Sequence, residues 1–573
     1  MLKKILMPLG LMAIITLPSV VKSQVNEPGS LGGSLRQNIE QQLPAPNPLP
    51  LPSSEKSLEE KNEPKADTLK IVLKGFKFQG VTLVSEEELQ IALANWIGKS
   101  VTLEELQQLN EVIAEVYKKK GYLVQVTLPP QKIGEDGIIL FSVMEAKFGG
   151  VNVDAQEDSR MSADILREFI FSENKIGEYI NIDSIERAIY VLKEIPGIAV
   201  ATEIEPGKND GEANLKIRME NTPLLNGRIE TNNYGSRSTG QSQGVGFISI
   251  NNPYGLGEQI TAYGLLTEAS QYGQFGYSLP VAFTAWRLGL TASMMNYNTV
   301  DSFGGSGGRS NTLGASLTYP LMRSSQSNAN LSLNYDQKSY LNLNTSLNSV
   351  TSSYVIKNIS STLTGNHYDS LWGGGINNAS ATITFGGLSF NQDNPSNYGV
   401  YTPGTFRKIN INLSRNQQIE EGKTFLNISF SAQLANENLD SSERFHLGGP
   451  SGVRAFPVAQ GSGSEGALFT LELQEQLPNR LLGSIFVDAG RVKQYVHPYD
   501  NWQGLTNASN EYSLLGAGVG AKWIYDQWTL SGSMAWRLKS NPLYTYTGES
   551  VNNDKRHLSR YSPYVWLQLQ YAL

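Results

Sequence analysis

Few residues of this chain have types and spacings that could do covalent chemistry. Its 573 residues include no cysteine, so thiolate metal sites, disulfides and cysteine nucleophiles are excluded. The four histidines are scattered without metal-ligand spacing: His367, His446, His497 and His557. Gly304–Gly308 has the G-x-S-x-G spacing of a nucleophile elbow, but no strand-to-helix context and no suitably placed histidine accompany it. We interpret it as a surface loop and expect no catalytic residue.

Nucleotide and nucleic-acid chemistry are not expected either. Gly461, Gly463 and Gly466 spell G-x-G-x-x-G, yet no helix follows that could present amides to a pyrophosphate. The net charge is −7 and no dense Lys/Arg tract occurs, whereas nucleic-acid binding depends on neutralising phosphates. The sequence therefore predicts a protein that is not an enzyme and has no cofactor, metal or nucleotide.

The composition divides the chain into two parts. Charged residues make up about 25% of residues 1–222 but only about 12% of residues 223–573. The first value is typical of soluble globular domains. The second part also holds 22 of the 26 tyrosines and seven of the eight tryptophans, as the aromatic girdles of an outer-membrane barrel would require.

The first 23 residues have the features of a secretory signal peptide. Lys3 and Lys4 precede the apolar run 5–16, and Val21–Ser23 is an acceptable cleavage site. After this segment no run of 18 apolar residues occurs, which excludes a membrane-spanning helix. A membrane location would therefore require a closed barrel.

Residues 24–66 form a polar arm that ends in a proline-rich linker, Pro44–Pro52. Four apolar residues recur at every fourth position and would give a helix one apolar stripe: Leu31, Leu35, Ile39 and Leu43. Arg36 and Glu40 would lie on the polar side. We hypothesise that a helix from Gly29 to Leu43 plugs the barrel at rest; the alternative is a disordered tail with a coincidental pattern.

Residues 67–147 and 148–222 have one order of elements, β-α-α-β-β. In the first module, Ser85–Glu88 and Thr102–Glu105 are capping boxes that open two helices. The second module repeats the order with helices expected near 163–171 and over 182–193. Two copies of one small α+β module therefore stand in tandem.

Residues 223–573 consist of short segments in which apolar and polar residues alternate. Alternation alone fits a soluble sandwich as well as a barrel. We place sixteen segments, starting near residues 227, 244, 259, 274, 286, 311, 330, 353, 378, 407, 423, 466, 481, 512, 526 and 563. The even number and a spacing of about 22 residues per strand plus connection favour a membrane β-barrel of about 16 antiparallel strands.

These features are similar to those of the two-partner secretion transporters, a family within the outer-membrane barrels that carry periplasmic POTRA domains. Gly121-Tyr122 followed by Leu128-Pro129-Pro130-Gln131 resembles a signature of the family's first module. Asn232–Gly240 resembles the family's D-N-x-G-S stretch, with asparagine where aspartate is usual. Phe486–Gly490 looks like its F-x-D-x-G wall strand. The resemblance covers nearly the whole chain.

The superfamily's most specific signature is an arginine-containing tip on a loop that folds back into the barrel. Here the tip reads Val453-Arg454-Ala455-Phe456, with Ala455 where glycine is usual, on a loop of about residues 435–465 between segments 11 and 12. Strand alternation points Asp488 into the lumen, where a carboxylate at membrane depth needs a partner. We predict a pair of Arg454 with Asp488, with Glu472 as the second candidate. The alternative is unrelated polar groups in a wet lumen.

The resemblance implies a transporter in the outer membrane of a Gram-negative bacterium, with its POTRA domains in the periplasm. Its partners would be outer-membrane lipid and one large exoprotein, recognised unfolded through an N-terminal secretion domain, and it would act as a monomer. The cargo class stays open among adhesins, haemolysins, haem-capturing proteins and contact-dependent toxins. The alternative functions are a barrel-assembly factor and a passive solute channel.

Overall fold

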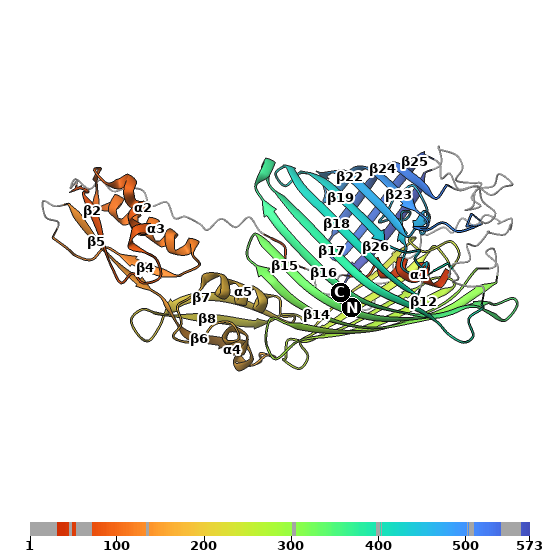
Figure 1. Cartoon of the computed structure of the whole chain (residues 1–573), viewed down its shortest axis with the longest axis horizontal. Coiled ribbons are helices and arrows are strands. Elements are labelled where there is room, and N and C mark those ends of the chain that lie inside the picture. The colour runs from red at the N-terminus through yellow and green to blue at the C-terminus, as the bar shows by residue number, and fades with distance from the viewer. Residues whose placement is uncertain are drawn as a thin grey trace, which may run out of the picture.

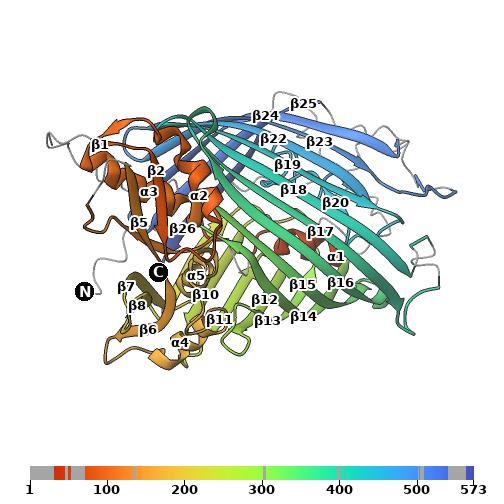
Figure 2. The ribbon, with the colours of Figure 1, turned by 60° about the vertical axis from the view of Figure 1, so that its left-hand side comes forward.

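The computed structural model describes residues 31–44, 49–52, 71–132, 137–300, 305–396, 401–402, 404–500, 502–503, 509–539 and 563–573. The expected signal peptide, residues 24–30 of the arm and residues 45–48 of the proline-rich linker lie outside these residues. Two small domains lie in a row and lead to one end of a large barrel, and a short helix lies inside that barrel (Figures 1 and 2).

The first module packs two helices on a three-stranded sheet. Both capping boxes form as predicted, because the Ser85 and Thr102 side chains accept hydrogen bonds from the Glu88 and Glu105 amides. The sheet has the order β2-β5-β4, with β2 parallel to β5. The elements are β1 (Ile71–Val72), β2 (Gly75–Gln79), α2 (Glu86–Leu93), η1 (Ala94–Trp96), β3 (Ser100–Val101), α3 (Leu103–Lys119), β4 (Val124–Thr127) and β5 (Ile138–Glu145).

The second module repeats this architecture with the sheet order β6-β8-β7. Its core is formed by one apolar face of each helix against the sheet, including Leu166, Leu192 and Ile217, which are fully buried. The elements are β6 (Lys147–Ala155), α4 (Ala163–Phe171), α5 (Ile182–Lys193), β7 (Ile198–Pro206) and β8 (Glu212–Asn221). The predicted tandem of two α+β modules with one architecture is confirmed.

The rest of the described chain is one closed antiparallel barrel, which confirms the predicted fold class. Closure occurs where β26 pairs with β9. Each predicted segment corresponds to one strand. The strands are β9 (Leu225–Asn232), β10 (Gln243–Asn251), β11 (Gln259–Leu266), β12 (Ser270–Pro280), β13 (Arg287–Asn298), β14 (Ser306–Arg323), β15 (Ser327–Asn344), β16 (Ser349–Asp369), β17 (Gly375–Phe390), β18 (Thr405–Glu420), β19 (Thr424–Ala435), β22 (Glu465–Leu477), β23 (Leu481–Lys493), β24 (Glu511–Tyr525), β25 (Trp528–Lys539) and β26 (Tyr564–Ala572).

Burial alternates along the barrel strands as the sequence predicts. On β23, Ile485 and Val487 are exposed on the outer face, whereas Phe486 and Asp488 are buried on the inner face. The outward-facing side chains of this strand are apolar, and the inward-facing ones include the carboxylate of Asp488.

Among the helices of the described residues, none has the length and apolar character needed to cross a bilayer.

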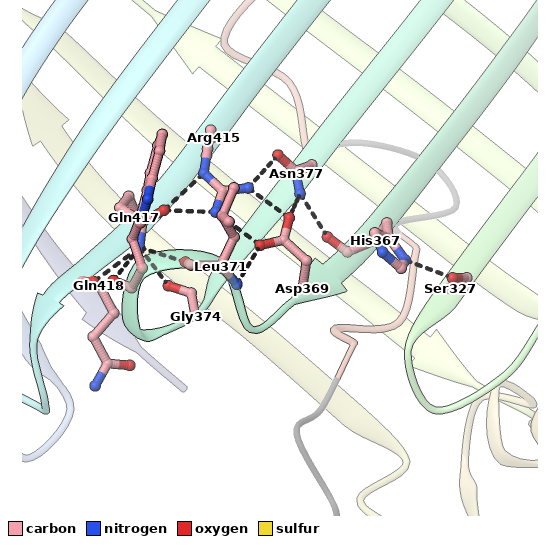
Figure 3. Close-up of polar contacts among 10 residues, drawn as sticks. Ser327, His367, Asp369, Leu371, Gly374, Asn377, Arg415, Gln417 and Gln418 are labelled. Atoms are coloured by element: carbon pink, nitrogen blue, oxygen red, sulfur yellow. Dashed lines mark hydrogen bonds and ion pairs between the residues drawn. The ribbon is translucent and has the colours of Figure 1, made fainter.

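One arginine ties three strands together on the outer face of the barrel, at the end that carries the modules. Arg415 on β18 donates to Asp369, at the end of β16, through Nη1 (2.7 Å) and Nη2 (2.9 Å). Its remaining donors reach Asn377 Oδ1 on β17 (2.7 Å) and Gln417 Oε1 (2.6 and 2.9 Å), as Figure 3 shows. All five N–H donors of the guanidinium are used, so this cluster is a structural clasp with no donor left for a ligand.

Replacing Arg415 should lower the heat resistance of the folded barrel. Arg415→Ala strands the Asp369 carboxylate, while Arg415→Lys keeps the charge but loses the planar fork, so we expect alanine to have the larger effect. The temperature at which the folded band disappears in a heated-sample gel measures this. Lys357→Ala, on the exposed outer face of β16, is the control. Equal melting of the arginine variants and the control would contradict the role of the clasp.

Candidate functional site in the barrel lumen

The connection between β19 and β22, residues 436–464, folds back into the barrel and places its tip against the wall. A tight turn forms the tip, in which the Phe456 amide donates to the Val453 carbonyl at 3.0 Å. Val453, Ala455 and Phe456 are buried and share one apolar cluster with the wall residues Phe486 and Leu514. The apolar members of the tip thus hold it in place and leave Arg454 to make polar contacts.

Arg454 contacts both carboxylates that the sequence suggested as partners. Its Nε and Nη2 donate to the two oxygens of Asp488, each at 2.9 Å, and its backbone amide donates to the same carboxylate at 3.0 Å. Its Nη1 donates to Glu472 Oε2 at 2.6 Å. The Asp488 side chain is 0% exposed, so a fully buried carboxylate is neutralised by a bidentate arginine.

Two aromatic side chains complete the surroundings of Arg454. The guanidinium carbon lies 3.2 Å from the centroid of the Phe486 ring, and Trp566 Nε1 donates to the Arg454 carbonyl at 2.8 Å. Contacts to β22, β23 and β26 therefore fix one residue of the loop.

Ala455 fits the tip without the positive φ that glycine would permit. Its methyl group lies against Gly516 on β24, where an added Cβ would come within 2.6 Å of the Ala455 Cβ. The departure from the usual glycine is accommodated by a glycine in the facing wall.

A second anchor, which the sequence did not reveal, holds the base of the same loop. The Glu443 carboxylate, almost fully buried, lies 3.0 Å from Lys338 Nζ on β15 and 2.6 Å from Lys408 Nζ on β18. Asn358 on β16 donates to it at 3.0 Å. Alternation points both lysines inward and could have suggested an acidic partner, but the irregular loop gives no periodic signal for Glu443.

The N-terminal helix α1 (Leu31–Glu40) lies inside the barrel (Figure 2). Leu35 and Ile39 pack against inward-facing side chains of β10 to β13, and Leu43 packs partly against the same cluster. The side chain of Leu31 lies outside the described part of the structure. The apolar stripe therefore meets the wall, as the helix hypothesis requires.

The polar side of α1 also contacts the wall. Arg36 is 1% exposed. It donates to Ser310 Oγ at 3.0 Å, to Ser293 Oγ, and to Glu40 Oε1 at 2.7 Å.

The helix is shorter than the 15 residues expected over 29–43. It ends at Glu40, and a turn leads to Leu43. Pro44 contributes to this early end, because it has no N–H to donate to the Glu40 carbonyl and disfavours the helical region at Leu43.

Gln37 connects the helix to the inward-folded loop. Its Nε2 donates to the Arg444 carbonyl at 2.5 Å, and its Oε1 lies 2.8 Å from His446 Nε2. Arg444 and His446 lie one and three residues after the anchor residue Glu443, so the helix and the base of the loop form one connected assembly in the lumen. Sequence periodicity could not have shown this contact.

The second module is fixed to the rim of the barrel. Glu194, at the end of α5, pairs with the buried Arg323 at the end of β14, with its Oε2 3.0 Å from Arg323 Nη2. The Phe169 ring of α4 meets the Phe283 ring of a barrel turn edge to face, with centroids 6.1 Å apart. The second module is therefore joined to the barrel rim by an ion pair and an aromatic contact.

Comparison with known proteins agrees with this architecture. Residues 211–523 match the family model described as haemolysin secretion/activation protein ShlB/FhaC/HecB, and residues 71–146 match the POTRA domain, ShlB-type. The heme/hemopexin transporter protein HuxB of Haemophilus influenzae (strain 86-028NP) is 27% identical over 76% of this chain and 78% of its own. The outer membrane transporter CdiB of Dickeya dadantii (strain 3937) is 25% identical over 80% and 82%.

Solved structures share the fold. CdiB from Escherichia coli superposes with a TM-score of 0.67 at 20% identity, over 94% of this chain and 95% of its own. BamA from Haemophilus ducreyi, lacking POTRA domains 1–3, gives a TM-score of 0.51 at 15% identity, over 88% and 100%. The family match spans more than half of the chain. The chain therefore belongs to the haemolysin secretion/activation protein ShlB/FhaC/HecB family of outer-membrane transporters, which export partner exoproteins.

Proposed function

We propose that this transporter exports one large exoprotein and rests in a sealed state. The observation that carries the proposal is a lumen occupied by α1 and the inward-folded loop, in a barrel whose strand number would otherwise leave an aqueous channel. The unfolded client docks through its N-terminal secretion domain on the periplasmic modules, α1 withdraws, and the client passes through a single barrel as an extended chain.

Capture by strand addition suits an unfolded client, because main-chain pairing does not depend on sequence. The described sheet of the first module ends at β2 and β4, and that of the second at β6 and β7. These edges offer unpaired backbone groups for such pairing. A passive solute channel would need no tandem folded modules, and the family match favours secretion over barrel assembly.

Deleting residues 69–147 should abolish binding of the partner's secretion domain. The deletion removes the first module, while the second module keeps its own core and its contacts with the barrel rim. A pull-down with the purified secretion domain of the partner exoprotein measures the effect. Arg454→Ala is the matched control, since it changes the lumen and should bind normally. Unchanged binding to the deletion variant would argue against docking on the first module.

A further inference from the structure

Three rows of neutral hydrogen-bonding side chains cross the inner face of strands β15 to β19. The strand registers align one residue of each strand in every row. The rows are Ser332, Thr362, Thr382, Asn410 and Gln433; Asn330, Thr364, Ser380, Asn412 and Ser431; and Asn328, Asn366, Asn378, Ser414 and Ser429. We call these fifteen residues the amide wall. None of them is charged, aromatic or aliphatic.

The alternation of the strands places this set in the lumen. The residues between the rows, such as Ile383, Ile409 and Leu413, are exposed on the lipid-facing side. Within the set, Asn412 donates to Ser380 at 3.1 Å and Asn378 donates to Ser414 at 3.3 Å. Each carboxamide has two N–H donors, and both asparagines stay exposed to the lumen, so they can also bond to a passing molecule.

Helix α1 and the loop tip lie against other parts of the wall, whereas the base of the loop reaches the first row, where Gln433 donates to the Glu443 and Ser464 carbonyls at 3.0 Å. Helix α1 packs on inward side chains of β10 to β13 and meets β14 and β15. The loop tip is fixed by β22, β23 and β26. Lys408, which points inward from β18, pairs with Glu443 at the loop anchor, and the three rows themselves carry no charged side chain.

One end of the amide wall already binds a main-chain carbonyl of this chain. The carbonyl of Pro50, in the linker that follows α1, accepts from Asn366 Nδ2 at 2.8 Å and from Asn328 Nδ2 at 3.2 Å. These residues stand in the row nearest the periplasmic modules. Proline has no amide hydrogen and favours an extended backbone, so the contact is recognition of a main-chain carbonyl by two carboxamides.

We infer that the amide wall is a binding track for the main chain of the extended client, and that the linker occupies its periplasmic end at rest. This inference rests on the proposed function. Hydrogen bonds to neutral carboxamides and hydroxyls are individually weak and are available to any peptide carbonyl, whatever the side chains. Fixed charges would instead retain client segments of opposite sign. The ligand class is an unfolded polypeptide, which must displace Pro50 when it enters.

The linker contact can be tested in the full-length chain, because it has no native cysteine. Leu51, which is 82% exposed, can be replaced with cysteine and spin-labelled. In the labelled protein, Asn328→Asp and Asn366→Asp remove both hydrogen-bond donors to the Pro50 carbonyl at nearly constant side-chain size. The electron paramagnetic resonance spectrum of the label should then change from that of an immobilised label to that of a mobile one. Asn296→Asp, exposed on β13, adds one aspartate away from the linker contact and should leave the label immobilised. An immobile label in the double variant would overturn the assignment.

Client binding is tested by displacement of the same labelled linker. An uncharged 40-residue peptide of glycine, serine and threonine should mobilise the label in the otherwise unaltered chain. Asn378→Asp with Asn412→Asp, which leaves Asn328 and Asn366 in place, should raise the half-displacing peptide concentration about threefold or more. The proposed track would be overturned if the peptide did not mobilise the label, or if the half-displacing peptide concentration were the same in both proteins. Failure of the secretion-domain pull-down would instead count against the proposed docking and leave this result standing.

Discussion

Arg454→Ala should give a barrel that inserts into the outer membrane but secretes its partner poorly. The substitution leaves the buried Asp488 carboxylate without its bidentate partner and also removes the cation beside Glu472. Stranding a buried charge costs on the order of 3–5 kcal/mol, enough to release the loop tip from the wall without unfolding a closed barrel. The amount of exoprotein in the medium, relative to heat-modifiable barrel in the membrane, measures the effect.

Substitutions of Asp488, Glu472 and Arg454 should reduce secretion to different degrees, according to how many hydrogen bonds each one removes. Asp488→Ala should match Arg454→Ala, because Asp488 accepts three of the four hydrogen bonds that the residue donates to carboxylates. Glu472→Gln should be milder, because glutamine can still accept the single bond from Nη1. Arg454→Lys keeps the charge but loses the bidentate fork, so secretion should fall between wild type and Arg454→Ala. Normal secretion with either alanine variant would refute the proposed role of the pair.

Strand positions and inward faces were predictable because both follow from a local period of two residues. The alternation around Ile485 and Val487 is enough to place Asp488 in the lumen. The same alternation points Lys338 and Lys408 inward. Their partner Glu443 lies on an irregular loop, where no period relates sequence to direction, so this anchor required the structure.

The ends and partners of α1 were less predictable than its apolar face. The spacing of Leu35, Ile39 and Leu43 identifies a stripe, but the described helix ends at Glu40, before the proline that follows. The contact of Gln37 with the Arg444 carbonyl joins residues 407 positions apart. The joint between Glu194 and Arg323 likewise depends on how two domains dock, which the local pattern of neither domain encodes.

Removing residues 24–43 should raise single-channel conductance and antibiotic uptake while the barrel stays folded. A sixteen-stranded barrel has room for an aqueous channel, and the helix now fills part of that space through contacts with β10 to β15. The barrel closes through its own strand ladder, including the β26–β9 pairing, and does not need the helix for closure. Planar-bilayer recordings and growth on antibiotics that the outer membrane normally excludes measure the two effects.

Single substitutions in and after α1 should show whether the contacts of the helix with the wall close the channel, or whether any N-terminal arm in the lumen would do so. Arg36→Ala removes the hydrogen bonds to Ser293 and Ser310 and leaves the apolar stripe in place. The channel of this variant should therefore open more often than that of the wild type, but should be open for a smaller fraction of the time than the variant that lacks residues 24–43. Gln41→Ala changes an exposed residue just after the helix and should behave as wild type. In the structure the arm lies against the wall through one buried arginine and two buried apolar side chains, so its release should depend on those contacts. If conductance after the deletion equals that of the complete chain, the arm does not plug the lumen.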